Sequence, residues 1–389
     1  MKMKTAVVVG AGPCGYVAVR RLREKLKPKD LRIILITKDE YHYFPPLFAD
    51  LALGEVELDE IRAPAKRIAE LYEAEFVLGE VTDVDPQNKK VKVGNDEYSY
   101  DYLFLCTGVS YDFEKVPGLK EHGYHTYTLE GALKLREALK DFKGGKVLLL
   151  APEFPFRCAG LPFELAGKLL YLATKKGVDA NVTITLPAPK ERIMQSMQEI
   201  PMTVGMVHQK YFPGKIEYKF GKVPKEVTEN KVKFEDGSEE EYDLLIYMPP
   251  NRPPKFLANK EDFLCPNDKR WLVSTFPNFR HPKYNNIFIP TDAAMPCMRL
   301  PPVGVITHAA AVAAADSAIA EITGTGAPIP FPNQVPLVAD LGPTGIMIVF
   351  EIVGKEGNVV KTKRYVSFTS PLIKSMKLSF YLGWIASLR

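Results

Sequence analysis

Cys158 lies where a nucleotide-binding unit would have a glycine-rich phosphate turn. It follows an apolar run typical of a buried strand and precedes a helical pattern, in the segment VLLLAPEFPFRCAGLPFELAG at residues 147–167. A thiolate is a nucleophile and a redox group, and a neighbouring cation such as Arg157, or the amino terminus of the following helix, stabilises it. The alternative for Arg157 is a solvated surface charge. The segment predicts thiol chemistry where a related unit would hold a nicotinamide cofactor.

A glycine fingerprint, Gly10, Gly12 and Gly15, follows an apolar run at the start of the chain. In such a fingerprint the first glycine permits a tight turn, the second lets the backbone approach a pyrophosphate, and the third allows a helix to pack closely on a strand. An acidic residue is expected at the end of the next strand, to bind the adenosine ribose. That strand ends at Thr37, with Asp39 two residues on, and we assign Thr37 to the cofactor site.

Two further strand ends favour a flavin, FAD, over a nicotinamide as the cofactor of this first unit. Thr107 and Gly108 end one buried strand, and Asp292 ends another, ahead of a helix. Flavoproteins with two dinucleotide domains bring backbone groups and a carboxylate to the ribityl chain at such positions. The alternative for Asp292 is a helix cap. We also assign Val81 to this site.

Five cysteines, an odd number, are dispersed along the chain. This pattern argues against a framework of structural disulfides and favours redox or buried roles. The spacings do not match those of metal ligands, so no metal site is predicted. We expect Cys14 to serve in packing and Cys106 to be a buried, inert thiol.

The chain has 389 residues and the composition of a folded protein with two or three domains. Its basic character is concentrated after Gly354, where Lys355, Lys361, Lys363, Arg364, Lys374, Lys377 and Arg389 face Glu356 alone. Because large apolar residues accompany these cations, an anionic membrane surface is favoured over nucleic acid as the partner. No apolar stretch is expected to span a bilayer. The start of the chain does not resemble a signal peptide, which favours a cytoplasmic location.

The pattern of apolar runs predicts an α/β fold with two Rossmann-like βαβ units, the second inserted into the first. In the first unit we expect strands at 5–9, 31–37 and 102–106 around a helix ending near residue 26, and an antiparallel meander before the third strand. The second unit restarts near residue 117. The predicted domains are an FAD-binding domain at 1–115 and 280–330, a degenerate second domain at 116–279, and a C-terminal region for quinone and membrane at 331–389.

These motifs together resemble those of the sulfide:quinone oxidoreductases and of the flavoprotein subunit of flavocytochrome c sulfide dehydrogenase, which are relatives of the type II NADH dehydrogenases. The segments that carry the resemblance are GAGPCG, GEVTDVDP, YDYLFLCTG, APEFPFRCAGLPFE and NNIFIPTDA. The resemblance covers nearly the whole chain and implies FAD as cofactor, with sulfide and a quinone as substrates. A type II NADH dehydrogenase would have a second glycine fingerprint where this chain has Cys158.

The resemblance implies a redox-active cysteine pair beside the flavin, with Cys158 as its first member. The second family cysteine normally precedes an Ala-Asp-hydrophobe-Gly sequence, but residues 336–342 read PLVADLG. Cys297, which follows Asp292, is our first candidate for the partner, and the alternatives are Cys265 and a single working thiol. Hydrosulfide would then attack a Cys158–Cys297 disulfide by thiol–disulfide exchange. Glu164 lies where the resemblance places a carboxylate near the flavin, and it is assigned to proton transfer, with an ordinary helical ion pair as the alternative.

A membrane quinone is the expected electron acceptor, because the chain has neither a second glycine fingerprint nor a haem signature. Phe350, Phe380 and Tyr381 are candidates for contact with it. The C-terminal tail, PLIKSMKLSFYLGWIASLR, is apolar nearly all round and favours monotopic membrane insertion on the cytoplasmic face; the alternative is a helix packed on its own protein. A homo-oligomer is also compatible with this tail. The competing functions are a flavocytochrome-type sulfide dehydrogenase subunit, a type II NADH:quinone dehydrogenase and a non-catalytic flavin redox sensor.

Overall fold

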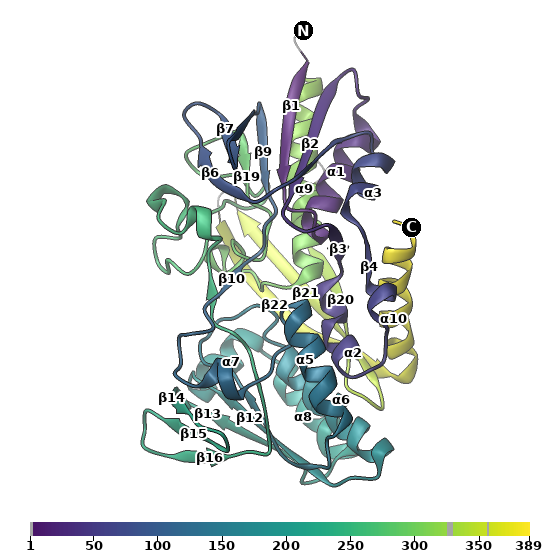
Figure 1. The fold of residues 1–389 in the computed structure, drawn as a ribbon, viewed down its shortest axis with the longest axis vertical. Helices are drawn as coiled ribbons and strands as arrows, with labels where there is room; N and C mark the ends of the chain where they lie inside the picture. The colour runs from purple at the N-terminus through teal and green to yellow at the C-terminus, as the bar shows by residue number, and fades with distance from the viewer. Residues whose placement is uncertain (1–2, 325–329, 356–357) are drawn as a thin grey trace.

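The computed structural model describes residues 3–324, 330–355 and 358–389. It has two parallel sheets at opposite ends of the long axis, with a third, antiparallel sheet between them (Figure 1). The α/β class predicted from the sequence is confirmed. The boundaries of the three predicted domains stay predictions, and residues 325–329 and 356–357, which include Glu356 of the basic tail, lie outside the described residues.

The first sheet has five parallel strands in the order β19-β9-β1-β2-β5. Its strands are nearly continuous apolar runs, as parallel strands covered on both faces require. The first helix, α1 (Pro13–Lys25), packs against the last long helix of this part, α9 (Gly304–Thr323). The strands are β1 (Lys4–Val9), β2 (Leu31–Thr37), β5 (Glu75–Leu78), β9 (Tyr102–Leu105) and β19 (Ile287–Phe288).

The predicted antiparallel meander precedes β9 and is formed by β6 (Val81–Asp85), β7 (Lys90–Val93) and β8 (Asp96–Ser99). Short elements connect the rest of this part: β3 (Tyr41–Tyr43), α2 (Phe48–Ala52), β4 (Arg62–Pro64), α3 (Ala65–Leu71), β10 (Ser110–Tyr111), α4 (Leu119–His122) and β18 (Asn251–Arg252).

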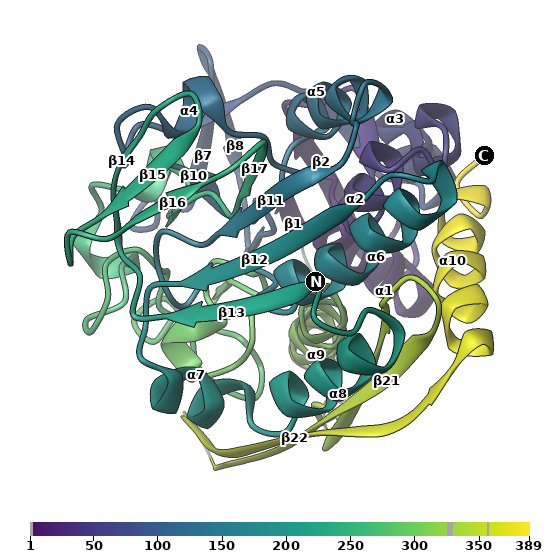
Figure 2. The same ribbon diagram turned by 90° about the horizontal axis from the view of Figure 1, so that it is seen from below.

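The second sheet has four parallel strands in the order β13-β12-β11-β17, which lie side by side in Figure 2. The segment with Cys158 connects β11 (Gly145–Leu150) to α6 (Leu161–Lys176), so the predicted strand-turn-helix is confirmed. The other elements of this part are α5 (Leu129–Lys140), β12 (Ala180–Leu186), α7 (Lys190–Met197), α8 (Ile200–Tyr211), β13 (Ile216–Phe220), β14 (Pro224–Val227), β15 (Lys231–Phe234), β16 (Glu239–Glu241) and β17 (Leu244–Tyr247).

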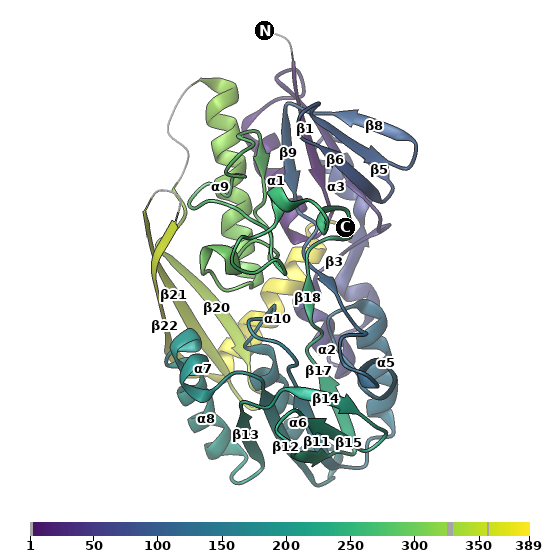
Figure 3. The ribbon, with the colours of Figure 1, turned by 90° about the vertical axis from the view of Figure 1, so that its left-hand side faces the viewer.

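The C-terminal part is an antiparallel sheet of β20 (Gln334–Asp340), β21 (Gly345–Lys355) and β22 (Asn358–Ser370), followed by a helix, α10 (Pro371–Ala386) (Figure 3). The helix begins at a Ser370 cap, whose hydroxyl accepts a hydrogen bond from the Leu372 amide. One side of α10 is buried against the protein through Ile373, Lys377, Tyr381 and Ile385. The other side exposes Leu372, Met376 and Phe380, with 73%, 52% and 58% of their surfaces accessible.

One helix among the described residues is long and apolar enough to cross a membrane, and it is α9 rather than the C-terminal helix. This corrects the expectation that the chain has no such stretch. More than half of its apolar window is buried inside the protein, where its many alanines allow close packing on α1. The length and composition of α9 therefore fit a helix of the protein core as well as they fit a membrane-spanning helix.

Candidate active site

A cavity of about 1190 Å³ lies where the two dinucleotide-type units and the C-terminal sheet meet. The amino termini of three long helices, α1, α6 and α9, open onto it. It brings together most of the residues predicted from the sequence: Gly10, Gly12, Thr37, Val81, Thr107, Gly108, Cys158, Glu164, Asp292, Phe350, Phe380 and Tyr381. Of the predicted residues, Gly15 and Cys297 do not line it.

The glycine fingerprint has the geometry that a bound diphosphate requires. Gly10 has φ of 100°, and a Cβ atom there would lie 2.6 Å from the carbonyl oxygen of Cys106. A Cβ atom on Gly15 would collide with the Gly10 carbonyl, which explains why this glycine supports the turn from outside the cavity. Gly12 has open space around it and caps α1 without a side-chain hydrogen bond. Pro13, the first residue of α1, has no N–H group, and the amide groups that follow it are available to an anion.

Two strand ends present polar groups that suit a flavin. The Thr107 hydroxyl is buried and has no hydrogen-bond partner among the described residues. The Gly108 amide donates to the Thr291 hydroxyl at 2.9 Å. A buried hydroxyl without a partner costs free energy unless a ligand satisfies it. The open Gly12, the uncapped α1 and the orphaned Thr107 hydroxyl therefore fit a dinucleotide cofactor.

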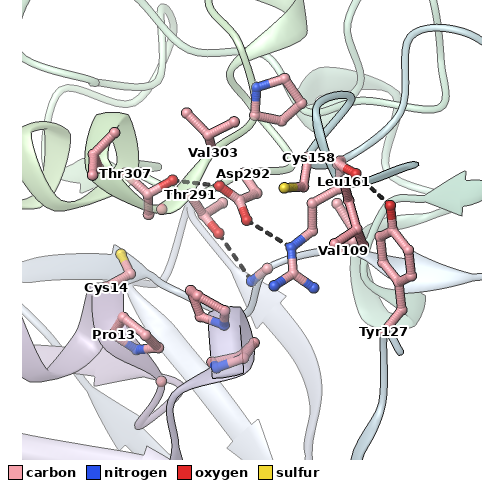
Figure 4. A pocket seen from close by; sticks show the side chains of 18 of the residues that line it. Pro13, Cys14, Val109, Tyr127, Cys158, Leu161, Thr291, Asp292, Val303 and Thr307 are labelled. Carbon is pink, nitrogen blue, oxygen red and sulfur yellow. Dashed lines mark hydrogen bonds and ion pairs between the residues drawn. The ribbon is translucent and has the colours of Figure 1, made fainter. Parts of the chain in front are cut away.

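Asp292 is held between the two units of the fold. Its carboxylate accepts a hydrogen bond from the Thr307 hydroxyl and another, at 3.0 Å, from Nε of Arg157 (Figure 4). The alternative that Asp292 caps α9 is wrong, because the cap residue of that helix is Val303. Arg157 also donates to the Tyr111 hydroxyl at 2.5 Å, and it is largely buried. The alternative of a solvated surface charge for Arg157 is therefore wrong as well.

Thr37 and Val81 also line the cavity, and both are buried. The Thr37 hydroxyl accepts a hydrogen bond of 3.2 Å from the Asp39 amide, so the strand end forms a local turn. Asp39 itself lines the cavity and is the nearest acidic residue to the strand end.

Cys158 adopts a left-handed backbone conformation, with φ of 56°, two residues before the Gly160 cap of α6. Its amide donates to the Pro302 carbonyl at 2.9 Å, which places it at the start of α9 as well. Burial is the largest cause that raises the pKa of its thiol to about 11, followed by the negative charge of Glu164. The Arg157 charge acts in the opposite direction but is outweighed. The effect of Arg157 on the thiolate thus has the expected direction, but burial and Glu164 outweigh it, so the thiol is protonated near neutral pH.

The predicted Cys158–Cys297 pair is wrong in this structure. Cys297 forms a disulfide with Cys265, with the two Cα atoms 5.8 Å apart, and Cys158 is the free cysteine of the described chain. The physical reason is a backbone contact: the Leu272 amide donates to the Ala293 carbonyl at 2.7 Å, which draws the hairpin carrying Cys265 to the turn carrying Cys297. Of the alternatives named above, a single working thiol remains.

Cys14 and Cys106 also form a disulfide, with their Cα atoms 5.4 Å apart. The expectation of a packing residue and an inert thiol was wrong because β1 and β9 are parallel neighbours, so the residues that follow them meet at one edge of the sheet. Both residues line the cavity.

Glu164 forms an ion pair with Lys377 of α10, and both side chains line the cavity. Burial raises the pKa of Glu164, and the Lys377 charge opposes this shift. The alternative of an ordinary pair within one helix is replaced by a pair that joins two distant helices. Lys377, which we expected at a membrane surface, is instead 6% exposed. Sequence reasoning missed Lys377 as a site residue. Its spacing of four residues from the apolar Ile373 and Tyr381 was the available signal that all three lie on one buried side of the helix.

The three candidate quinone residues all line the cavity. Phe350 is buried, Tyr381 stacks at a tilt on Phe44 with ring centroids 4.7 Å apart, and Phe380 is largely exposed. Phe380 therefore lies at the mouth of the cavity, on the exposed side of α10.

Comparison with known proteins agrees with this fold. Residues 4–150 match the pyridine nucleotide-disulphide oxidoreductase family. The crystal structure of the sulfide:quinone oxidoreductase from the hyperthermophilic bacterium Aquifex aeolicus superposes with a TM-score of 0.79, covering 99% of this chain and 91% of that one at 22% identity. The chain thus has the α/β fold of this class of oxidoreductases, and the class implies a flavin cofactor.

Within this class, the resemblance to the sulfide:quinone oxidoreductases is confirmed. The sulfide-quinone reductase of Aquifex aeolicus is 26% identical over 293 residues, which are 73% of this chain and 67% of that protein. The type II NADH:quinone oxidoreductase of Staphylococcus haemolyticus is 28% identical over 204 residues, which are 48% of this chain and half of that protein. Both relatives support a flavin-dependent oxidoreductase.

Proposed function

We propose that this protein oxidises sulfide with the help of FAD and passes the electrons to a quinone. The observation that carries the proposal is the free thiol of Cys158, which lines the cavity at the turn between β11 and α6. The similarity to sulfide-quinone reductase over most of the chain supports it.

The same turn argues against NADH as the electron donor. A dinucleotide turn needs glycines so that the backbone can approach the pyrophosphate. Here Phe154, Pro155 and Phe156 occupy that place, all three line the cavity, and Phe156 is buried. NADH:quinone oxidoreduction is nevertheless the second candidate, because the staphylococcal type II enzyme matches half of the chain.

The chemistry needs only one cysteine. The sulfur of hydrosulfide forms a bond to Sγ of Cys158, while the S–H bond of Cys158 breaks and its proton goes to solvent. Two electrons would pass to bound FAD as the oxidant, and the product is a persulfide on Cys158. A second hydrosulfide then attacks the outer sulfur, which restores the Cys158 thiol and releases a hydrodisulfide by thiol exchange. Repetition on the released chain gives polysulfide. The high pKa of Cys158 means that hydrosulfide, rather than the protein thiol, brings the negative charge.

Bound FAD would accept the two electrons and deliver them to the quinone. Its diphosphate suits the open space at Gly12 and the start of α1, and its ribityl chain suits Thr107 and Asp292. Arg157 orients Asp292 and connects it to the loop of Cys158. The backbone around Cys158 fixes the thiol between the starts of α6 and α9.

The quinone would reach the cavity from the membrane. Phe380 lies at its mouth and Tyr381 further inside, and Glu164 with Lys377 would supply a proton to the reduced quinone. The exposed apolar residues Leu372 and Met376 of α10 would insert shallowly into the bilayer. The protein would then be a peripheral membrane protein on the cytoplasmic face.

Stopped-flow spectroscopy of the purified flavoprotein tests the proposal. Sulfide should bleach the flavin absorbance, NADH should not, and a short-chain quinone should restore it. Bleaching by NADH in place of sulfide would transfer the proposal to the second candidate, and a flavin that neither donor bleaches would contradict both.

A further inference from the structure

A chain of buried charges leads from the cavity to the surface through α6, α10 and the end of α2. Lys168 of α6 has no exposed side-chain surface, and its ammonium lies 2.6 Å from Oδ1 of Asp50 and 2.7 Å from Oε2 of Glu55. A third carboxylate, that of Asp340, lies 3.3 Å away. The Lys168 ammonium donates a hydrogen bond to Asp50 and forms ion pairs with the other two carboxylates.

The chain continues inward from Asp50. Its second oxygen, Oδ2, lies 3.7 Å from the ammonium of Lys377, which pairs with Glu164 at the cavity wall. Asp50 is 4% exposed and Lys377 6% exposed, whereas Glu55 is 29% exposed. The order from cavity to solvent is therefore Glu164, Lys377, Asp50, Lys168 and Glu55, with acids and bases alternating.

The network has an excess of one negative charge. Its described members are four carboxylates and three ammoniums, the remaining two being Asp340 and Lys374. Burial disfavours an uncompensated charge, so the network binds one further proton more readily than separate surface pairs do. Burial raises the pKa of Glu164, while the charges of Lys377 and Lys168 lower the pKa of Asp50 to about 2. The extra proton thus belongs at Glu164, next to the cavity.

Asp50 has a second property that a purely structural ion pair would lack. Its Oδ2 atom is buried and accepts no hydrogen bond from a described residue. An unsatisfied buried carboxylate oxygen costs free energy. Oδ2 of Asp50 is therefore an unoccupied acceptor between Lys168 and Lys377. The 3.7 Å separation of this atom from the Lys377 ammonium is the one contact in the series of charges that is longer than a hydrogen bond.

We propose that Glu55, Lys168, Asp50, Lys377 and Glu164 form a proton path that supplies the reduction of the electron acceptor in the cavity. This inference rests on the proposed function, because a quinone takes up two protons with its two electrons. Glu55 is the solvent end, Glu164 is the donor at the cavity, and Lys168, Asp50 and Lys377 relay the proton between them.

Each transfer balances without a change in the charge of the lysines. Glu164 gives its proton to the acceptor, and the Lys377 ammonium passes one to Glu164 while it receives one through Asp50. Lys168 likewise gives a proton to Asp50 while it receives one from Glu55, and Glu55 is protonated again from water. The oxygens of Asp50, Glu55 and Asp340 lie within 4.8 Å of one another around Lys168, so these steps are short.

The test uses the second half of the reaction alone. Flavoprotein reduced with one equivalent of dithionite is mixed with a short-chain quinone, and flavin absorbance and proton uptake, by an indicator dye, are followed together. E55Q and D50N should slow both signals by about tenfold or more. In D2O the variants should slow further than the unchanged protein does, and a small acid such as formate should restore part of the E55Q rate.

D316N provides the matched control. Asp316 is 6% exposed and pairs with Arg21 at 2.7 Å, so its replacement disturbs a buried ion pair of α1 and α9 outside the path. Its reoxidation rate should match that of the unchanged protein. Flavin content and thermal unfolding of every variant are measured first. If D50N does not fold, E55Q alone tests the path, because the Glu55 side chain is the most exposed of the five.

The outcomes separate the two proposals. If quinone does not reoxidise the unchanged protein, the proposed function fails. If it does, but E55Q and D50N behave like D316N, the proton path is overturned. If E55Q and D50N are reoxidised slowly but show no larger D2O effect than the unchanged protein, and formate does not rescue E55Q, the proton path is also overturned. A purely structural role of these residues would give that result.

Discussion

The amide of Cys158 donates a 2.9 Å hydrogen bond to the carbonyl of Pro302. This bond ties the loop before α6 to the segment before α9, so Cys158 lies next to the starts of both helices. The position of the thiol is thus set by backbone contacts. Changes of the side chain should alter the chemistry and leave the loop in place.

Cys158→Ala should therefore abolish reduction of the flavin by sulfide and leave the flavin bound. The reason is that the side chain supplies the only free thiol of the described chain and no contact on which the loop depends. Anaerobic spectra with sulfide measure the effect, and reoxidation of the dithionite-reduced variant by quinone is the control. Continued bleaching by sulfide would show that the sulfur chemistry lies elsewhere.

The pH dependence of alkylation should reveal the environment of the same thiol. Burial and then the Glu164 charge raise the pKa of Cys158 to about 11, so only about 0.1% of it is thiolate at pH 8. The rate of reaction with iodoacetamide, followed by mass spectrometry, should still rise with pH above 9. Glu164→Gln removes one of these causes and should lower the pKa and speed the reaction at pH 8. An alkylation rate that levels off at pH 8 would contradict the raised pKa of Cys158.

Sequence reasoning succeeded where the signal is local. The spacing of Gly10, Gly12 and Gly15 predicts the tight turn and the close packing of the helix within six residues. It failed where the outcome depends on tertiary contacts. Cys297 is 32 residues from Cys265, and only the register between their loops shows that they pair.

The C-terminal helix shows the same limit. A helix that is apolar nearly all round does not reveal which side faces the protein, so Lys377 resembled a membrane-facing charge. The structure places it against Asp50 and Glu164, which lie more than two hundred residues earlier. Neither carboxylate can be matched to the lysine by spacing.

The Cys265–Cys297 disulfide should contribute to stability and not to turnover. Its loop of 32 residues corresponds to about 3–4 kcal/mol of unfolding free energy in the chain-entropy model. Cys265→Ser and Cys297→Ser should each lower stability to this extent in urea unfolding, with sulfide-driven flavin reduction retained. Loss of that reduction in Cys297→Ser alone, at unchanged stability, would restore Cys297 as the partner of Cys158.

Gly12→Ala should separate cofactor binding from folding. A Cβ atom at Gly12 meets no protein atom within 4 Å and projects beside the proposed diphosphate site. The apoprotein should keep its unfolding free energy within about 0.5 kcal/mol, while its affinity for FAD falls. Gly10→Ala is the contrasting variant, because its Cβ would lie 2.6 Å from a backbone oxygen and should impair folding itself. Titration of both apoproteins with FAD, with urea unfolding in parallel, measures the difference. Unchanged FAD binding by Gly12→Ala would contradict the assignment of this loop.

We predict that the exposed side of α10 binds to a membrane surface. Leu372 and Met376 are 73% and 52% exposed on one face of the helix, while the opposite face holds Lys377 in its buried ion pairs. Removing the whole helix would break those pairs, so point changes are the sharper test. Because burial of a large apolar side chain stabilises by about 1.5–3 kcal/mol, the double change of Leu372 and Met376 to Ser should weaken binding to anionic vesicles by tenfold or more. Leu78→Ser, at a 50% exposed position on β5, is the matched control and should bind as before. Co-sedimentation with vesicles measures the effect, and equal sedimentation of the double variant and the control would contradict this role of α10.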